Sequence, residues 1–225
     1  MKPLLILRPE PGASETVTAA RALGLDAYAF PLFAIEPVAW TVDRRTPYDA
    51  IFVTSANAIR HAGPGLAGLR DHILLAVGPA TADAARAAGF TDIVTGSSDG
   101  MALADLAAAL GHEHLLHLAG DPHKPIDHPT LRFDVKIVYQ SIGIAATDEL
   151  REMLSKPCTV LVHSPRAARQ LASLVEANER EQIDVVAISD KAAAAAGDGW
   201  SGLHWPAELS ADAMLDLAVP LCRAG

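Results

Sequence analysis

The stretch that decides the fold is AIFVTSANA, residues 50–58. Its first half, AIFV, is a short apolar run without polar alternation, which is typical of a strand buried on both faces of a sheet. The run leads into Thr54 and Ser55, and a serine directly before a helical stretch is a preferred helix N-cap. The stretch therefore predicts a strand, a tight turn and a helix, the repeating unit of an α/β fold.

The second half of the chain repeats this pattern in TVLVHSPRA, residues 159–167. The runs LLAVGP at residues 74–79 and VVAISD at residues 185–190 match at a similar spacing. Any α/β protein repeats strand–loop–helix units, but the matched order of separate elements favours two similar halves. We therefore expect a duplicated α/β architecture.

The remaining apolar runs and turn signals extend the same alternation along the chain. A helix is predicted to begin at Ser14, run through Arg21 and be closed by Gly24. Further strands are predicted at residues 4–7, 27–30, 33–38, 115–118 and 135–139. Strands that alternate with helices form parallel sheets flanked by helices. The predicted fold class is α/β, with two similar domains built on parallel sheets flanked by helices and a ligand cleft between them.

Composition and charge restrict the class of protein. Half of the 225 residues are hydrophobic and 20% are charged, which is typical of a globular chain. No apolar run reaches the roughly 18 residues of a membrane-spanning helix, and the N-terminal run stops at Arg8, too early for a secretory signal. Cys158 and Cys222 match no metal-ligand spacing and are interpreted as reduced thiols of a cytoplasmic protein. The formal net charge of −9 argues against nucleic-acid binding.

The turns between strands and helices are the candidate binding sites. The first amides of a helix lack intrahelical partners and carry partial positive charge, so such turns bind carboxylates and phosphates. Four turns carry additional groups that favour anion binding, namely hydroxyls, a glycine that exposes the backbone, or basic side chains. Arg8, directly after the first strand, is a further basic residue. The candidate substrate-binding residues are Arg8, Thr54, Ser55, Ala56, Asn57, Gly78, Thr81, Ser164, Arg166 and Lys191. The alternative is that the serines are only N-caps, each worth about 1 kcal/mol.

Several cofactor motifs are missing from the sequence. No G-x-G-x-x-G follows the first strand, and no P-loop pattern occurs, so a dinucleotide or nucleotide cofactor is not expected. His112, His114 and His117 lie close together, but no cysteine or carboxylate spacing supports a metal site around them. We expect no metal.

Five motifs together resemble the uroporphyrinogen-III synthase family. They are the Arg8-Pro9 opening, residues 48–58, residues 76–82, the VYQS motif at residues 138–141 and the HSP turn at residues 163–165. Each motif is weak alone, but their order and spacing extend over nearly the whole chain. The first half matches better than the second.

The resemblance implies two α/β domains joined by two extended segments, with residues 1–36 and 144–225 in one domain and residues 37–143 in the other. The chain departs from the family where a Gly-Pro-Thr turn is common, because it has Ser189-Asp190-Lys191 there. Lys191 would then replace a hydroxyl-bearing anchor by a charge.

The resemblance also implies a reaction. The substrate would be hydroxymethylbilane, a linear tetrapyrrole with many carboxylates, which is cyclised with inversion of its last pyrrole ring and loss of water. No metal or organic cofactor is implied, the enzyme would be a lyase, and a monomer is expected. Tyr139 would supply the proton that the leaving hydroxyl needs, because hydroxide is a poor leaving group. Lys124, with Arg8, Arg166 and Lys191, would supply positive charge.

Three alternatives to this interpretation stay open. In the first, Tyr139 is only a half-buried aromatic residue whose hydroxyl is hydrogen-bonded locally. In the second, the chain is a non-catalytic two-lobed binding protein for an anionic metabolite. In the third, it is a degenerate paralogue that kept the fold and lost the activity.

Overall fold

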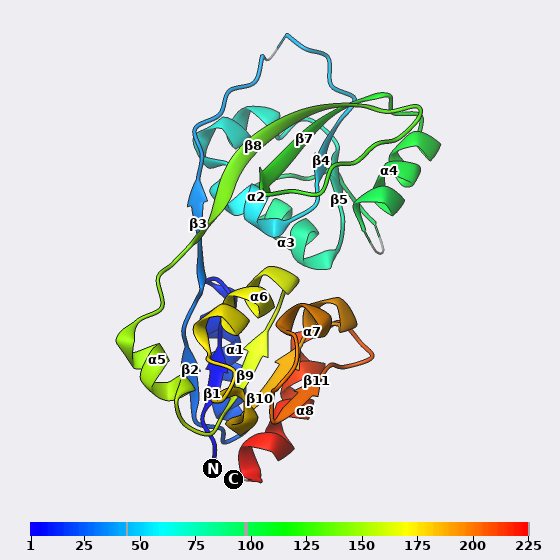
Figure 1. The fold of residues 1–225 in the computed structure, drawn as a ribbon. Helices are drawn as coiled ribbons and strands as arrows, with labels where there is room; N and C mark the ends of the chain where they lie inside the picture. The colour runs from blue at the N-terminus through cyan, green and yellow to red at the C-terminus, as the bar shows by residue number, and fades with distance from the viewer. Residues whose placement is uncertain (44, 97–98, 225) are drawn as a thin grey trace. The chain divides into compact units, whose positions relative to one another are not determined.

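A computed structural model describes residues 1–43, 45–96 and 99–224 of the chain. The chain forms two compact units (Figure 1). The first unit consists of Met1–Ala34 and Gly143–Gly225, and the second of Ile35–Ile142. The chain passes from one unit to the other within β3 (Phe33–Pro37) and at the end of β8 (Arg132–Gly143). Each unit has its own sheet, so each is described by itself.

The first unit is built on a parallel sheet with the strand order β11-β10-β9-β1-β2. The pairs β1/β2, β1/β9, β9/β10 and β10/β11 are all parallel. The central strands are fully buried, as their unbroken apolar runs predict. The strand bounds are β1 Leu4–Ile6, β2 Ala27–Ala29, β9 Cys158–Val162, β10 Ile183–Ala187 and β11 Gly202–His204.

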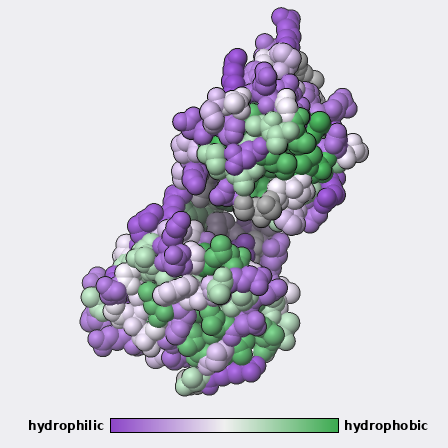
Figure 2. Space-filling model, turned by 90° about the vertical axis from the view of Figure 1, so that its right-hand side faces the viewer, coloured by the Kyte–Doolittle hydropathy of each residue, from purple (hydrophilic) through white to green (hydrophobic). Residues whose placement is uncertain are grey.

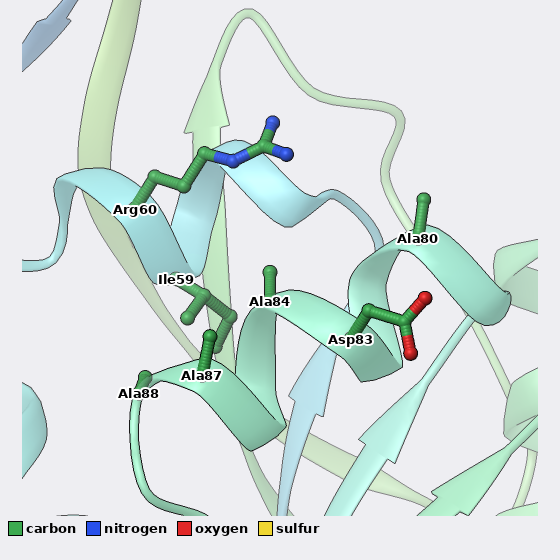
Figure 3. A pocket seen from close by; sticks show the side chains of 7 residues that line it. All are labelled: Ile59, Arg60, Ala80, Asp83, Ala84, Ala87 and Ala88. Atoms are coloured by element: carbon green, nitrogen blue, oxygen red, sulfur yellow. The ribbon is translucent and has the colours of Figure 1, made fainter.

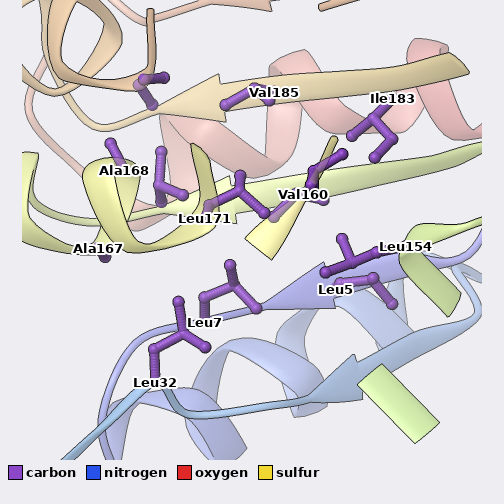
Figure 4. Close-up of a cluster of buried hydrophobic side chains, with 14 of the residues drawn as sticks. Leu5, Leu7, Leu32, Leu154, Val160, Ala167, Ala168, Leu171, Ile183 and Val185 are labelled. Atoms are coloured by element: carbon purple, nitrogen blue, oxygen red, sulfur yellow. The ribbon is translucent and has the colours of Figure 1, made fainter. Parts of the chain in front are cut away.

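Helices cover both faces of this sheet. One face packs against α1 (Gly12–Ala22) and α8 (Ala211–Arg223). The other face packs against α5 (Asp148–Leu154), α6 (Pro165–Leu174) and α7 (Asp190–Ala196), and a short 3-10 helix lies at Arg180–Gln182. Figure 4 shows the second of these cores, where Leu5 and Leu7 of the β1 region point toward the same side as Val160 of β9. Burial of such leucine and valine side chains stabilises the unit by about 1.5–3 kcal/mol each.

The second unit has a sheet with the strand order β3-β8-β7-β4-β5-β6. The pairs β4/β5, β4/β7, β5/β6 and β7/β8 are parallel. One face is covered by α2 (Ala56–His61), a 3-10 helix (Gly63–Leu69) and α3 (Pro79–Ala87), and the other by α4 (Gly100–Ala109). The remaining strand bounds are β4 Ala50–Val53, β5 Leu74–Ala76, β6 Ile93–Thr95 and β7 His114–Asp121.

The predicted fold class, two α/β units with parallel sheets flanked by helices, is confirmed. One helix boundary was wrong, because α1 begins at Gly12 and not at Ser14. The helix starts earlier because backbone hydrogen bonds form before Ser14: the Ala13 amide donates to the Pro9 carbonyl at 3.2 Å and the Glu15 amide to the Pro11 carbonyl at 3.1 Å. Gly24 closes the helix region as predicted, with a φ of +78°.

One face of the molecule carries apolar and polar residues in separate patches (Figure 2). Figure 2 shows hydrophobic residues gathered in places on each unit, with hydrophilic residues around them. In the described part of the chain, no helix combines the length and apolar character that crossing a bilayer requires.

Candidate anion-binding turns and a tyrosine at the sheet edge

Three of the predicted turns share one local geometry, in which a serine with extended backbone caps the following helix. Each hydroxyl accepts a hydrogen bond from a first-turn amide, at a length of 3.1–3.3 Å. The pairs are Ser55 with Asn57, Ser164 with Ala167 and Ser189 with Ala192. The serines are therefore N-caps, which stabilises each helix by about 1 kcal/mol. A binding role has to come from the other groups of these turns.

In the second unit, the turn between β4 and α2 has further polar groups within reach of a ligand. All four residues of the predicted group from Thr54 to Asn57 are partly exposed. Among the described residues, no hydrogen bond uses the amide of Ala56. Helix α2 is only six residues long, so its dipole is small and the turn would bind mainly through hydrogen bonds.

Thr54 also lines a small cavity of about 110 Å³. A basic residue, Lys124, lies on the same cavity, and Asp99 opposes it with a carboxylate. Hydrogen bonds from the Ala102 and Met101 amides lower the pKa of Asp99, so this carboxylate is charged at neutral pH. The full lining is Thr54, Asp99, Gly100, Met101, Lys124, Pro125 and Ile126.

The turn between β5 and α3 is next to this one, because β5 pairs with β4. Gly78 has an extended backbone, and a side chain there would meet nothing within 4 Å, so its backbone is open. Among the described residues, no hydrogen bond uses the Ala80 amide. Thr81 is only 6% exposed, and its amide donates to the Gly78 carbonyl at 3.1 Å. The structure therefore gives a ligand access to the backbone of this turn more than to the Thr81 hydroxyl.

Tyr139 lies at the carboxyl edge of the same sheet. It pairs with Gly120 on β7, two residues beyond Leu118, which pairs with Val53 at the end of β4. Its ring is partly buried and lies 6.3 Å from the ring of His61, centroid to centroid. The sheet thus brings Tyr139 to the edge that also carries the Thr54 and Gly78 turns.

In the first unit, Arg8 follows β1 beside the end of β9. The register places Ile6 opposite Leu161, so Arg8 comes next to His163. The guanidinium lies over Gly12, where a side chain would collide with it, and its Nη1 donates to Thr16 Oγ1 at 3.4 Å. Arg8 is therefore held at the carboxyl edge of its sheet by the start of α1.

Arg166 is in the first turn of α6, directly after the Ser164 cap and Pro165. Its guanidinium carbon lies 4.1 Å from the centroid of the Phe33 ring. Such a contact is worth about 0.5–2 kcal/mol and fixes the direction of the side chain. Arg8 and Arg166 thus both follow adjacent strands of one sheet.

The fourth turn, where the chain departs from the family pattern, shares the serine cap but differs from the others in its charge. The Asp190 carboxylate accepts a hydrogen bond from the Lys191 amide at 2.7 Å, and both side chains are exposed. A carboxylate in the first turn of a helix repels an anionic ligand from that end. This turn therefore offers an anion less than the other three.

His163, which follows β9 at the carboxyl edge of the first unit's sheet, belongs to the predicted HSP motif but was not among the candidate site residues. Both ring nitrogens are buried, and neither has a hydrogen-bond partner within the described ranges. Burial, with a smaller contribution from Arg8, lowers its pKa to about 3, so the ring is neutral at physiological pH. The alignment of residues 50–58 with residues 159–167 sets His163 opposite Thr54, and this correspondence could have identified it.

A surface hollow in the second unit borders the Gly78 turn through Ala80. It is an open groove of about 640 Å³ between α2 and α3 (Figure 3). Its lining is Ile59, Arg60, Ala80, Asp83, Ala84, Ala87 and Ala88, none of which is a predicted site residue. Among described residues, no three His, Cys, Asp or Glu side chains are grouped as a metal site requires.

The fold and its turns define a two-unit α/β protein with helix starts and arginines at the carboxyl edges of parallel sheets. A family model described as uroporphyrinogen-III synthase HemD matches residues 14–216. The match extends over most of the chain, so the chain belongs to the uroporphyrinogen-III synthase family. The resemblance read from the five sequence motifs is confirmed.

Solved structures agree with this assignment at the level of the fold. Uroporphyrinogen-III synthetase from Helicobacter pylori is similar with a TM-score of 0.70 and 17% identity, over 98% of this chain and 100% of that one. A mutant uroporphyrinogen III synthase from Thermus thermophilus is similar with a TM-score of 0.55 and 16% identity, over 99% and 100% of the two chains. Among curated proteins, no match to this chain was found.

Proposed function

We propose that this chain is a uroporphyrinogen-III synthase that converts hydroxymethylbilane into uroporphyrinogen III and water. The family match over residues 14–216 is the observation that carries this proposal. The reaction makes the chain a lyase of the hydro-lyase type. Proton transfer and control of the substrate's shape supply the catalysis, and no cofactor is required for either.

The first step removes the hydroxyl of the substrate. The carbon–oxygen bond breaks, its electron pair leaves with the oxygen, and a proton from the Tyr139 phenol, or from a water that Tyr139 holds, completes the leaving water. The pyrrole nitrogen stabilises the cationic carbon that remains. Support for Tyr139 comes from its position at the carboxyl edge of the second unit's sheet, with its ring partly exposed.

The later steps invert the last ring and close the macrocycle. A substituted carbon of the last pyrrole attacks the cationic carbon and forms a spiro intermediate, which opens and closes again with the ring inverted. The final ring carbon loses a proton, which returns the proton that Tyr139 gave. Bringing the two ends of a flexible chain together is chiefly an entropic problem, which a site that holds both ends solves.

Carboxylate binding at the turns would hold the substrate in this curled shape. Arg8 and Arg166 are the strongest candidates in the first unit, because both guanidiniums are held in place by neighbouring groups. In the second unit the proposed contacts are Thr54, Ser55, Ala56, Asn57, Gly78 and Thr81, and in the first unit Arg8, Ser164, Arg166 and Lys191. Thr81 and Lys191 are the weakest candidates of this set, because Thr81 is buried and Lys191 lies beside the Asp190 carboxylate.

Turnover separates the enzyme from a binding protein or an inactive paralogue. We would mix freshly prepared hydroxymethylbilane in large excess with the full chain in the presence of a chelator and follow substrate loss. An enzyme consumes many equivalents per chain faster than the spontaneous reaction. A binding protein or an inactive paralogue shields at most one equivalent and slows the loss, and this result would refute the proposal.

A further inference from the structure

The backbone beside Tyr139 departs from the regular alternation of a strand. In a strand, successive side chains point to opposite faces of the sheet. Val138 and Tyr139 are successive, yet both pack against the cluster between the sheet and the helices α2 and α3. The register explains this, because Ala119 pairs with Ile137 while Gly120 pairs with Tyr139, so Val138 is an extra residue. Such a bulge redirects a side chain.

Gly120 provides the room into which the bulge turns the tyrosine. A side chain at position 120 would overlap the Tyr139 ring, including the hydroxyl end. Gly120 is buried and is not among the glycines with a positive φ, so its backbone conformation is one that alanine also adopts. The structure therefore requires glycine here for space and not for backbone freedom.

The Tyr139 ring also lies near the end of helix α2. The ring of His61 at the end of this helix lies 6.3 Å away at an interplanar angle of 41°. Burial lowers the pKa of His61, and nearby Arg60 adds to this, so the imidazole is neutral at physiological pH. The phenol is thus bordered by the β7 backbone and by an uncharged ring.

We infer that Gly120 is a positioning residue that, with the bulge at Val138, holds the Tyr139 phenol on the α2 side of the sheet at its carboxyl edge. A larger residue at 120 displaces the ring from this place. The inference rests on the proposed role of Tyr139 as proton donor. Gly120 itself would not contact the substrate, and it would act by fixing the orientation of the Tyr139 side chain.

The direct test uses fluorotyrosine and fluorine NMR on the full chain. The sequence has three tyrosines, and the Tyr139→Phe variant assigns the Tyr139 resonance by its loss. We expect Gly120→Ala to shift the Tyr139 resonance and leave those of Tyr28 and Tyr48 in place. Gly143→Ala is the matched control, because a side chain there meets nothing within 4 Å, and it should shift none of the three.

Kinetics of the same variants then show whether the displacement matters. We expect Gly120→Ala to lower kcat about tenfold with KM within about twofold, since small displacements of a reacting group lower rates strongly. In the Tyr139→Phe background, Gly120→Ala should lower kcat no further, because the two residues act as one unit. An unmoved resonance, or an equal loss of kcat in both backgrounds, would overturn the inference.

Two further outcomes distinguish the inference from the proposed function. If Tyr139→Phe kept full turnover, the catalytic role of Tyr139 and with it the role of Gly120 would be refuted, while the fluorine shift would still report the geometry. If Gly120→Ala failed to fold, it would be combined with Tyr139→Ala. Recovery of the folded state in the double variant supports the overlap of ring and side chain, and no recovery refutes it.

Discussion

The guanidinium of Arg166 lies over the ring of Phe33, with 4.1 Å between the guanidinium carbon and the ring centroid. Phe33 is 6% exposed, so a buried ring supports a charged group at the start of α6. The contact fixes the side chain before any ligand arrives, and a pre-positioned guanidinium loses little entropy when it binds a carboxylate. Arg166 is therefore suited to bind a substrate carboxylate.

Replacing Arg166 by glutamine should weaken substrate binding more than it slows the reaction. We expect KM to rise about tenfold while kcat changes little, because a hydrogen bond to a charged group is worth about 1.5–3 kcal/mol. Steady-state kinetics with hydroxymethylbilane measures both constants. Arg169→Gln, on the exposed side of the same helix, is the control and should leave KM unchanged. Equal KM values for the two variants would remove Arg166 from the binding site.

Two substitutions of Ser164 separate capping from binding. Ser164→Ala removes the hydrogen bond to the Ala167 amide and should lower stability by about 1 kcal/mol. Ser164→Asp keeps a good cap but adds a negative charge, so it should preserve the melting temperature and raise KM for the anionic substrate. If Ser164→Asp kept both the melting temperature and KM, Ser164 would be a cap alone.

His117 should make the second unit sensitive to acid. It is 2% exposed in β7, its Nε2 has no hydrogen-bond partner in the described part of the chain, and its ring contacts Phe52 and Phe133 edgewise. Burial, followed by the charge of His123, lowers its pKa from 6.5 to about 4. Between these pH values His117 is protonated in the unfolded chain and neutral in the folded chain.

The free energy of unfolding should therefore be unaffected by His117 above pH 6.5 and should decrease as the pH falls from 6.5 toward 4. The slope from this one residue is at most about 1.4 kcal/mol per pH unit. His117→Phe fills the same space without a titrating group, so its unfolding free energy should fall less steeply. Calorimetric unfolding at several pH values tests this, and parallel curves for the two proteins would refute it.

Tyr139 and Tyr48 form a matched pair for the proton-donor proposal, because both are partly buried in the second unit. Tyr139→Phe should lower kcat by about 100-fold, the usual worth of a positioned acid. Tyr48 donates to Asp134 Oδ2 at 3.0 Å, so Tyr48→Phe should cost about 1 kcal/mol of stability and leave kcat unchanged. Equal kcat values for the two variants would contradict the proposed role of Tyr139.

The central strands could be predicted because burial on both faces leaves an unbroken apolar run, as in β4, β9 and β10. The edge strands β6 and β11 were not predicted. They are short, and their residues are partly or fully exposed, so they carry no continuous apolar signal. Strands β7 and β8 extend beyond their predicted ends, because polar and small residues continue the pairing there.

The candidate site was predictable only as a set of turns. Motif spacing located Ser55, Ser164 and Gly78, since each stands between a strand and a helix. The direction of Tyr139 was not predictable, because the bulge at Val138 breaks the alternation on which such an inference depends. Burial of Thr81 and the supporting contact of Arg166 with Phe33 depend on tertiary packing between distant segments.

The type of porphyrin formed from hydroxymethylbilane tests the account most directly. After oxidation of the products, the isomers are separated and compared between the active chain and a heat-inactivated sample of the same protein. We predict mostly isomer III with the active chain and isomer I with the inactivated sample, because uncatalysed closure leaves the last ring in its original orientation. Isomer I alone from both samples would contradict the assignment as a synthase.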